Sequence, residues 1–243
     1  MAKHPNVILL TLDCLRPDHL GCYGYKAVET PNIDWLAENG VRCENAYCHG
    51  TNTWVSHASI MTGLLPPNHG CRTLYSRIGQ SAHTLAELLS ANGYRTLGIP
   101  GTALVDRERG FDRGFDIYRI EEVREAGVQL PRHVLDPLGQ WFKTGREPFA
   151  AWIHYFGLHN RKDPSVVRYS PGFSPFAQWY DGKISHADEH LIGPLIQMLK
   201  AFGVLEDTLL VITSDHGEDL NAVHTGGSGH NNEPKKEIVR IPL

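Results

Sequence analysis

The feature that most constrains the fold is a pattern that occurs twice, in which an apolar strand runs directly into metal-binding side chains. Leu209–Ile212 is a short apolar run typical of a buried strand, and it is followed closely by Asp215 and His216. The first predicted strand, Asn6–Leu12, runs into Asp13 in the same way. Open α/β sheets bind ligands at the carboxyl ends of their strands. We therefore expect these three side chains to lie together and to bind a cation.

The size and charge of the chain limit the classes of function that it can have. Its 243 residues suffice for one large α/β domain spanning residues 1–243. A net charge of −4 gives no basic surface for nucleic acid, and no apolar run approaches the length of a membrane span. The five cysteines are scattered, and no leader-like segment precedes the first strand. We therefore expect free thiols and a cytoplasmic location.

Predicted helices and strands alternate along the chain. The pattern predicts helices at Pro31–Gly40, with Thr30 as the N-cap, at Thr84–Asn92 and at Phe176–Ala201, the last kinked at Gly193-Pro194. Further strands are predicted at Arg95–Ile99 and Phe149–Tyr155, and residues 160–175 are predicted to form an active-site loop. This alternation favours βαβ units and a mostly parallel sheet.

Several segments, taken in order, resemble the sulfatase family of the alkaline phosphatase superfamily. They are Asn6–Gly24, Thr30–Gly40, Thr53–Gly63, Pro67–Gly70, Thr213–Glu218, Gly229–His230 and Ile238–Leu243. The resemblance implies an α/β fold: a three-layer α/β/α sandwich with a mostly parallel central sheet, as in alkaline phosphatase. In the family a smaller carboxyl-terminal subdomain follows, which we expect to be absent from this sequence, so that residues 1–243 form one catalytic domain. Three explanations stay open: a minimal form, a fragment, or a missing piece that comes from elsewhere.

Thr53 occupies the position of the family nucleophile. Sulfatases have Cys or Ser there, which is converted to formylglycine, and Thr cannot undergo that conversion. A Thr alkoxide resembles instead the phosphodiesterase and phosphotransferase branches, because a hydroxyl needs a metal to hold its alkoxide. The start of a helix at Trp54–Met61 would also help to bind an anion. The alternative is that Thr53 is only the N-cap of this helix.

The resemblance also implies the metal ligands. They are Asp13, Thr53, Asp215, His216 and His230. Many sulfatases have two adjacent Asp residues where this chain has Asp13-Cys14. Losing one carboxylate while gaining a histidine ligand shifts the preference from calcium toward zinc or manganese, with one or two ions.

Other histidines match functional positions of the family. His159 and His230 are expected either to donate to the transferring oxyanion or to hold a second metal. His57 stands where sulfatases have Arg, and it either orients the oxyanion or caps the helix. His224 also resembles a family histidine. Two alternatives stay open for it with equal weight: a supporting role at the site, or no role there.

Four further residues match positions that we interpret as structural. Arg16 and Asp18 are expected to brace the metal loop, and Asp181 and Asp188 to be packing and surface residues. A sulfate-binding lysine of the family is replaced by Pro100. His57 also replaces an Arg of the family. Two cationic side chains that contact sulfate in the family are therefore missing from this sequence.

The sequence therefore predicts a metal-dependent hydrolase of small phosphate or sulfate esters, with catalytic residues Thr53, His57, His159 and His230. Phosphate mono- or diesters fit better than sulfate because the formylglycine precursor is missing. Three alternatives stay open: a phosphotransferase or mutase on the same fold, a true sulfatase, and a non-catalytic binding protein. Products formed with added alcohols would separate transfer from hydrolysis. The oligomeric state is not predicted.

Overall fold

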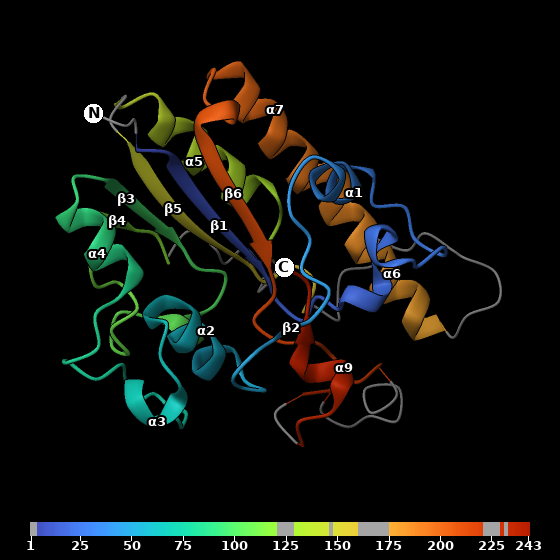
Figure 1. The fold of residues 1–243 in the computed structure, drawn as a ribbon, viewed down its shortest axis with the longest axis horizontal. Coiled ribbons are helices and arrows are strands. Elements are labelled where there is room, and N and C mark those ends of the chain that lie inside the picture. The colour runs from blue at the N-terminus through green and yellow to red at the C-terminus, as the bar shows by residue number, and fades with distance from the viewer. Residues whose placement is uncertain (1–3, 121–128, 146–147, 160–174, 221–228, 231–232) are drawn as a thin grey trace.

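The fold is built around a parallel β-sheet. The computed structural model describes residues 4–120, 129–145, 148–159, 175–220, 229–230 and 233–243. The sheet consists of β1 (Asn6–Leu12), β3 (Arg95–Ile99), β4 (Ile117–Tyr118), β5 (Phe149–Tyr155) and β6 (Thr208–Thr213), in the order β4-β3-β5-β1-β6 (Figure 1). Each neighbouring pair is parallel. A second, antiparallel pair joins β2 (Ala46–Tyr47) to β7 (Arg240–Ile241).

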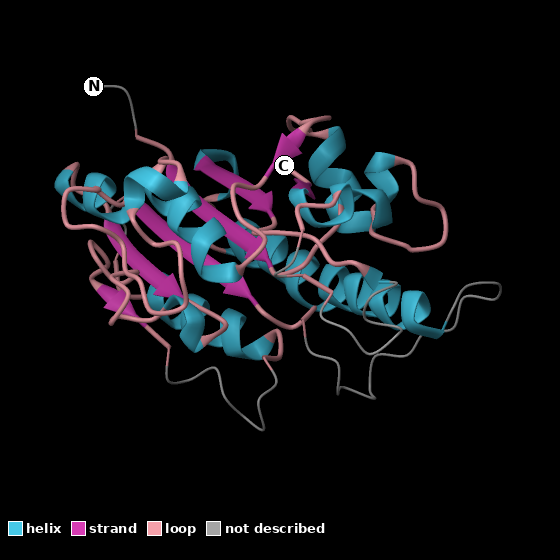
Figure 2. Ribbon diagram, turned by 90° about the horizontal axis from the view of Figure 1, so that it is seen from below, coloured by secondary structure: helices cyan, strands magenta, loops and turns pink. Residues whose placement is uncertain are grey.

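Helices cover both faces of the large sheet, as Figures 1 and 2 show. The longer helices are α1 (Pro31–Glu38), α2 (Thr53–Thr62), α4 (Leu85–Ala91), α5 (Arg132–Phe142), α6 (Pro175–Ala187) and α7 (Gly193–Ala201). Two shorter helices are α3 (Pro66–His69) and α9 (Lys236–Val239). The expected three-layer α/β/α arrangement around a mostly parallel sheet is therefore confirmed.

The core lies on the two sides of the sheet because successive strand residues point to opposite faces. On β1, Ile8 and Leu10 join the larger cluster, which includes buried residues of α5, α6 and α7. Leu9 joins the other cluster, with Met61 of α2 and Trp152 of β5. Both faces of the central strands are therefore buried, which is why their sequences are continuously apolar.

Most element bounds follow the sequence pattern. β1, β3 and β5 span the predicted residues, and β6 is one residue longer at each end than predicted. Helix α5 was not predicted, because Pro137 and Gly139 weaken its helical signal. Its buried face, which includes Val134 and Leu138, forms only when it packs on the sheet. In the described part of the chain, no helix is long and apolar enough to cross a membrane.

The kink predicted at Gly193-Pro194 takes the form of a π-helical turn. Residues Asp188–Ile192 form this turn between α6 and α7, directly before Gly193. Proline has no N–H to donate to the preceding turn of an α-helix, and a π turn redistributes those backbone bonds. The turn carries Asp188, which is completely buried rather than at the surface.

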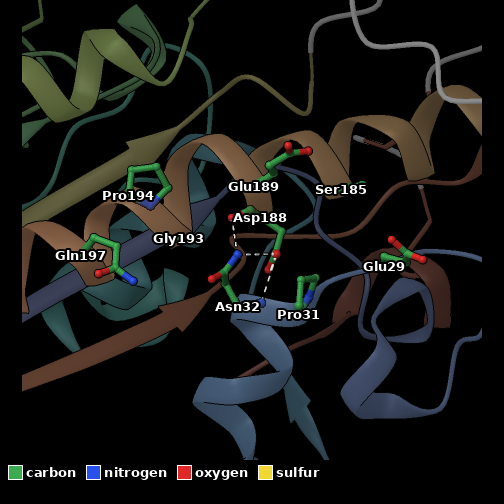
Figure 3. A pocket seen from close by; sticks show the side chains of 9 residues that line it. All are labelled: Glu29, Pro31, Asn32, Ser185, Asp188, Glu189, Gly193, Pro194 and Gln197. Atoms are coloured by element: carbon green, nitrogen blue, oxygen red, sulfur yellow. Dashed lines mark hydrogen bonds between the residues drawn. The ribbon is translucent and has the colours of Figure 1, made fainter.

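Asp188 caps the start of helix α1, although the two are far apart in the sequence (Figure 3). Its carboxylate accepts hydrogen bonds from the backbone N–H groups of Asn32, at 3.1 Å, and Ile33, at 2.8 Å. Pro31 has no N–H, so the N–H groups of Asn32 and Ile33 are the first in α1 that have no acceptor within the helix itself. Thr30 is the N-cap residue as predicted, but its side chain makes no capping bond. A surface pocket lies beside this contact and includes none of the predicted site residues.

Asp181 is the second residue for which the surface interpretation was wrong. It is buried, and its carboxylate accepts a hydrogen bond from Tyr25, while its other oxygen lies 2.7 Å from Nδ1 of His19. The two aspartates face α1 and the loop after β1. The predicted long helix therefore holds the first segment of the chain by buried polar contacts.

We predict that Asp188→Ala lowers the free energy of unfolding by about 1–3 kcal/mol, because it leaves two buried backbone donors unpaired. Asp188→Asn keeps one accepting oxygen and should lose less. Urea unfolding followed by circular dichroism measures the difference. The exposed neighbour Glu189→Ala is the control and should change stability by less than about 0.5 kcal/mol. Equal stability of Asp188→Ala and Glu189→Ala would contradict the capping role.

Candidate metal and catalytic centre

The register of the parallel strands brings the two predicted aspartates together. β1 pairs with β6 so that Thr11 lies opposite Thr213. Two residues farther on, Asp13 therefore faces Asp215, and both are fully buried. Oxygen and nitrogen atoms of Asp13, Asp215 and His216 lie within 4.8 Å of one another, which is close enough to hold one metal ion. The sequence thus predicted this grouping correctly.

The two loops that carry these residues are tied to each other. The hydroxyl of Ser214 accepts a hydrogen bond from the backbone N–H of Leu15 at 3.0 Å and donates to the carbonyl of Leu12 at 2.7 Å. Arg16 donates twice to Asp18 and once to the carbonyl of Glu218. Arg16 and Asp18 therefore brace the loop after β1 against the loop after β6, as predicted.

Gly217 is required for close packing. Its φ is not in the left-handed region, so the chain direction after His216 does not depend on a conformation restricted to glycine. A Cβ at this position would lie 2.0 Å from the carbonyl oxygen of Glu237, in α9. The glycine lets α9 approach the loop, and its N–H donates to the carbonyl of Ile238 at 2.7 Å.

The two aspartates have opposite pKa shifts. Burial would raise the pKa of Asp13, but a hydrogen bond from His154 and the charges of nearby histidines hold that pKa well below its usual range. Burial raises the pKa of Asp215, and the negative charge of Asp13 raises it further. Two carboxylates this close repel each other, and a bound divalent cation would remove the repulsion.

Thr53 points into the same group of atoms. Its Oγ1 lies 3.4 Å from Oδ2 of Asp13 and 3.3 Å from Nε2 of His216. The alternative reading of Thr53 as a helix N-cap is wrong, because the N-cap is Asn52 and Thr53 is the first residue of α2. Its hydroxyl is therefore available to the site, at the positive end of a ten-residue helix.

His57 lies beneath Thr53, one turn farther along α2. It is completely buried, and its Nδ1 donates to the carbonyl oxygen of Thr53 at 2.8 Å. Its Nε2 lies 3.0 Å from the hydroxyl of Thr11. Burial and the adjacent His154 hold the pKa of His57 well below its usual range, so the ring is neutral. Both nitrogens contact protein atoms, and this geometry supports a role in positioning Thr53.

His154 belongs to the site although it was not predicted from the sequence. It is the penultimate residue of β5 and lies opposite Thr11 of β1. Its Nε2 donates to Oδ2 of Asp13 at 3.1 Å. The available signal was a single histidine within an otherwise apolar buried strand. A histidine near the carboxyl end of this strand lies at the same edge of the sheet as Asp13.

Two buried polar atoms support a cation at this place. Among the described residues, Oδ2 of Asp215 and Nδ1 of His154 have no hydrogen-bond partner. Buried polar atoms are normally satisfied by a hydrogen bond or a bound ion. The acceptor atoms present are carboxylate oxygens and imidazole nitrogens, which suit a divalent transition metal. The residues therefore fit the metal that the resemblance implies.

The remaining predicted histidines lie on the other side of Asp13. His230 is nearly buried, and its Nδ1 lies 3.3 Å from Oε1 of Glu218. The ring of His159 is centred 5.1 Å from that of His230 and stacks on Phe156. Burial lowers the pKa of His159. The structure therefore gathers every predicted site residue, while His224 and residues 160–174 of the predicted loop lie outside the described residues.

Comparison with known proteins agrees with this arrangement. The sulfatase family model matches residues 5–243. Arylsulfatase A from Homo sapiens is 26% identical over 285 residues, covering 93% of this chain and 55% of that protein. Arylsulfatase A from Bos taurus is 34% identical, covering 94% and 55%. This chain thus spans about half the length of these relatives.

The solved structures agree on the fold. A phosphonate monoester hydrolase of Agrobacterium radiobacter superposes with a TM-score of 0.78 at 19% identity, covering 98% of this chain and 67% of that chain. At 19% identity, the similarity between the two structures shows only that they share a fold. The family model, in contrast, spans nearly all of the sequence and includes both strand-end motifs and the start of α2. This chain therefore belongs to the sulfatase family, within the alkaline phosphatase superfamily.

Proposed function

We propose that this chain is a metal-dependent hydrolase of phosphate or sulfate esters in which Thr53 is the nucleophile. The observation that carries the proposal is the position of the Thr53 hydroxyl between Oδ2 of Asp13 and Nε2 of His216. Asp13 and His216 could hold a cation beside this hydroxyl. A threonine hydroxyl has a high pKa and becomes an effective nucleophile only when its alkoxide is stabilised in this way.

Asp13, Asp215 and His216 are the proposed ligands of this metal. When bound, the ion supplies positive charge that stabilises both an alkoxide and the oxygens of a transferring phosphoryl or sulfuryl group. A donor set of two carboxylates and one imidazole favours zinc or manganese over calcium, which prefers oxygen ligands alone. His230 groups with Cys14 and His216 rather than with the two aspartates.

The other steps of the proposed reaction are carried out by side chains of the protein. His57 holds the carbonyl of Thr53 and so fixes the first turn of α2, which directs backbone N–H groups toward an anion. Thr53 forms a bond to phosphorus or sulfur as the ester oxygen leaves, and the departing alcohol takes up a proton. We propose that His159, whose pKa is lowered by burial, takes the proton of the Thr53 hydroxyl and passes it to this alcohol. Water then cleaves the threonyl ester and restores the hydroxyl.

We propose phosphate mono- or diesters as the preferred substrates. Thr53 cannot supply formylglycine, and His57 and Pro100 stand where sulfatases have cationic residues. Sulfate esters are the second candidate, because two relatives that match over most of this chain are named arylsulfatase A. We also propose a reducing, cytoplasmic location. All five cysteines are in the described part of the chain, and each is a free thiol.

We predict that Asp215→Ala removes most of the bound zinc or manganese together with the activity. The variant lacks one ligand and also the acceptor for the N–H groups of Cys14 and His216. Equilibrium dialysis followed by elemental analysis measures the bound metal. Asp219→Ala is the matched control, because that carboxylate also follows β6 and pairs with Lys235. Full metal occupancy in Asp215→Ala would exclude Asp215 as a ligand.

Thr53→Ala should reduce kcat by ~10³-fold or more while leaving metal content unchanged, as is usual when a covalent nucleophile is deleted. Thr53→Ser keeps a hydroxyl and should retain measurable turnover. Steady-state assays with an aryl ester, run beside metal analysis, test this. Thr62→Ala, at the opposite end of α2, is the control and should remain active. Near-native turnover of Thr53→Ala would mean that water attacks directly.

The metal-loaded protein should cleave aryl phosphates or phosphodiesters with a higher kcat/KM than the aryl sulfate that has the same leaving group. Phosphate monoesters carry up to two negative charges, and a cationic centre without formylglycine stabilises them more strongly. The comparison uses one enzyme preparation reconstituted with zinc or manganese. A clear preference for the sulfate would refute the argument from Thr53 and favour a true sulfatase.

A further inference from the structure

Cys14 lies at the centre of a second group of possible metal ligands. Its side chain is buried, and its Sγ lies 2.9 Å from Oδ1 of Asp13. The same sulfur lies 3.9 Å from Nδ1 of both His216 and His230. Zinc bound to one sulfur and one imidazole nitrogen holds the two atoms roughly 3.6 Å apart. The separation from His230 is close to that value.

The backbone holds this sulfur in place. Among the described residues, Cys14 is the only one other than glycine with a positive φ, at 63°. A non-glycine residue in this region is strained and persists only where its surroundings fix it. Its N–H donates to Asp215, and its carbonyl accepts from Tyr180 at 2.6 Å. Such strain is most often retained at functional sites.

His216 belongs to the first site and not to this one. Its Nδ1 lies 3.0 Å from the carbonyl of Gly217 and therefore carries the proton, which leaves Nε2 to face Thr53. Other donors near Cys14 include Nδ1 of His230 and Oε1 of Glu218, which lie 3.3 Å apart, and a ring nitrogen of His159. One sulfur, one nitrogen and one carboxylate oxygen form a donor set that suits zinc.

Asp13 connects the two groups of ligands. Its Oδ2 faces Thr53 and His154, whereas its Oδ1 faces Cys14. One carboxylate can therefore contact a metal on each side. We propose that Cys14, His230 and Glu218 form a second, thiolate-containing divalent-metal site that shares Asp13 with the first. The proposal rests on the first site being the metal centre of the proposed hydrolase.

A second cation would add positive charge to a centre that lacks two basic side chains of the family. His57 and Pro100 have replaced two of those residues. The thiolate also gives the centre a preference for zinc over manganese or calcium, since soft sulfur ligands select against hard cations. Cys14 thus has a role that an aspartate at its position could not fill in the same way.

Cobalt(II) is the probe, because thiolate ligation produces an intense charge-transfer band in the near ultraviolet. The metal-free full chain is titrated with Co²⁺ alone, and we expect about two equivalents to bind, with the band present. Cys14→Ser should abolish the band and lower the stoichiometry by about one. Cys71→Ser is the matched control, because that thiol is buried among apolar residues elsewhere. It should keep the band.

Two further variants keep the test decisive. His230→Ala should also abolish the band, which covers the case in which Cys14→Ser does not fold. Asp215→Ala should lose the first metal and retain the band. Saturation of the wild-type protein without a thiolate band, or a band that survives in Cys14→Ser, would overturn the second site. Ester hydrolysis without the band would leave the proposed function standing, whereas the band without hydrolysis would support this site alone.

Discussion

The structure of the centre depends on two buried carboxylates placed opposite each other. Asp13 and Asp215 follow adjacent parallel strands in register, so the sheet itself sets their separation. Burying one unpaired carboxylate is unfavourable, and burying two side by side is more so. The opposite pKa shifts of the two groups follow from this conflict. The surrounding imidazoles and backbone N–H groups compensate part of this cost, and a bound divalent cation would compensate the rest.

A rigid frame is needed to maintain such a site. Ser214 joins the ends of β1 and β6, Arg16 joins their loops, and Tyr180 of α6 holds the carbonyl of Cys14. On the other face, His57 and Ser56 of α2 contact the site from below. Ser56 donates to the carbonyl of Asp215 at 2.5 Å. Each ligand is thus fixed by an element with its own apolar packing, which limits reorganisation during a reaction.

The histidines explain much of the unusual composition of the chain. The sequence contains 14 histidines, and five of them lie at the candidate centre. Those gathered there are His57, His154, His159, His216 and His230. Neutral imidazole can ligate a metal and the protonated ring can donate, so these residues suit a site that lacks formylglycine. This distinguishes the centre from one that relies on arginine and lysine.

The sequence alone determined the four longest strands, the parallel sheet and most of the residues that gather at the candidate centre. This succeeded because buried strands are apolar throughout and because the carboxyl ends of parallel strands meet at one edge. Asp13, Asp215 and His216 follow directly from that rule. Thr53 needed the resemblance as well, since threonine is common at helix starts for other reasons.

Only the tertiary structure decided the rest. Helix α5 forms despite Pro137 because its apolar face packs on the sheet, and Asp188 is a helix cap because a π turn brings it to α1. His154 and Cys14 joined the centre through strand register and a left-handed backbone angle. Local sequence cannot encode these features, because each depends on residues far away in the chain. Pairing and packing bring those residues together only when the sheet has formed.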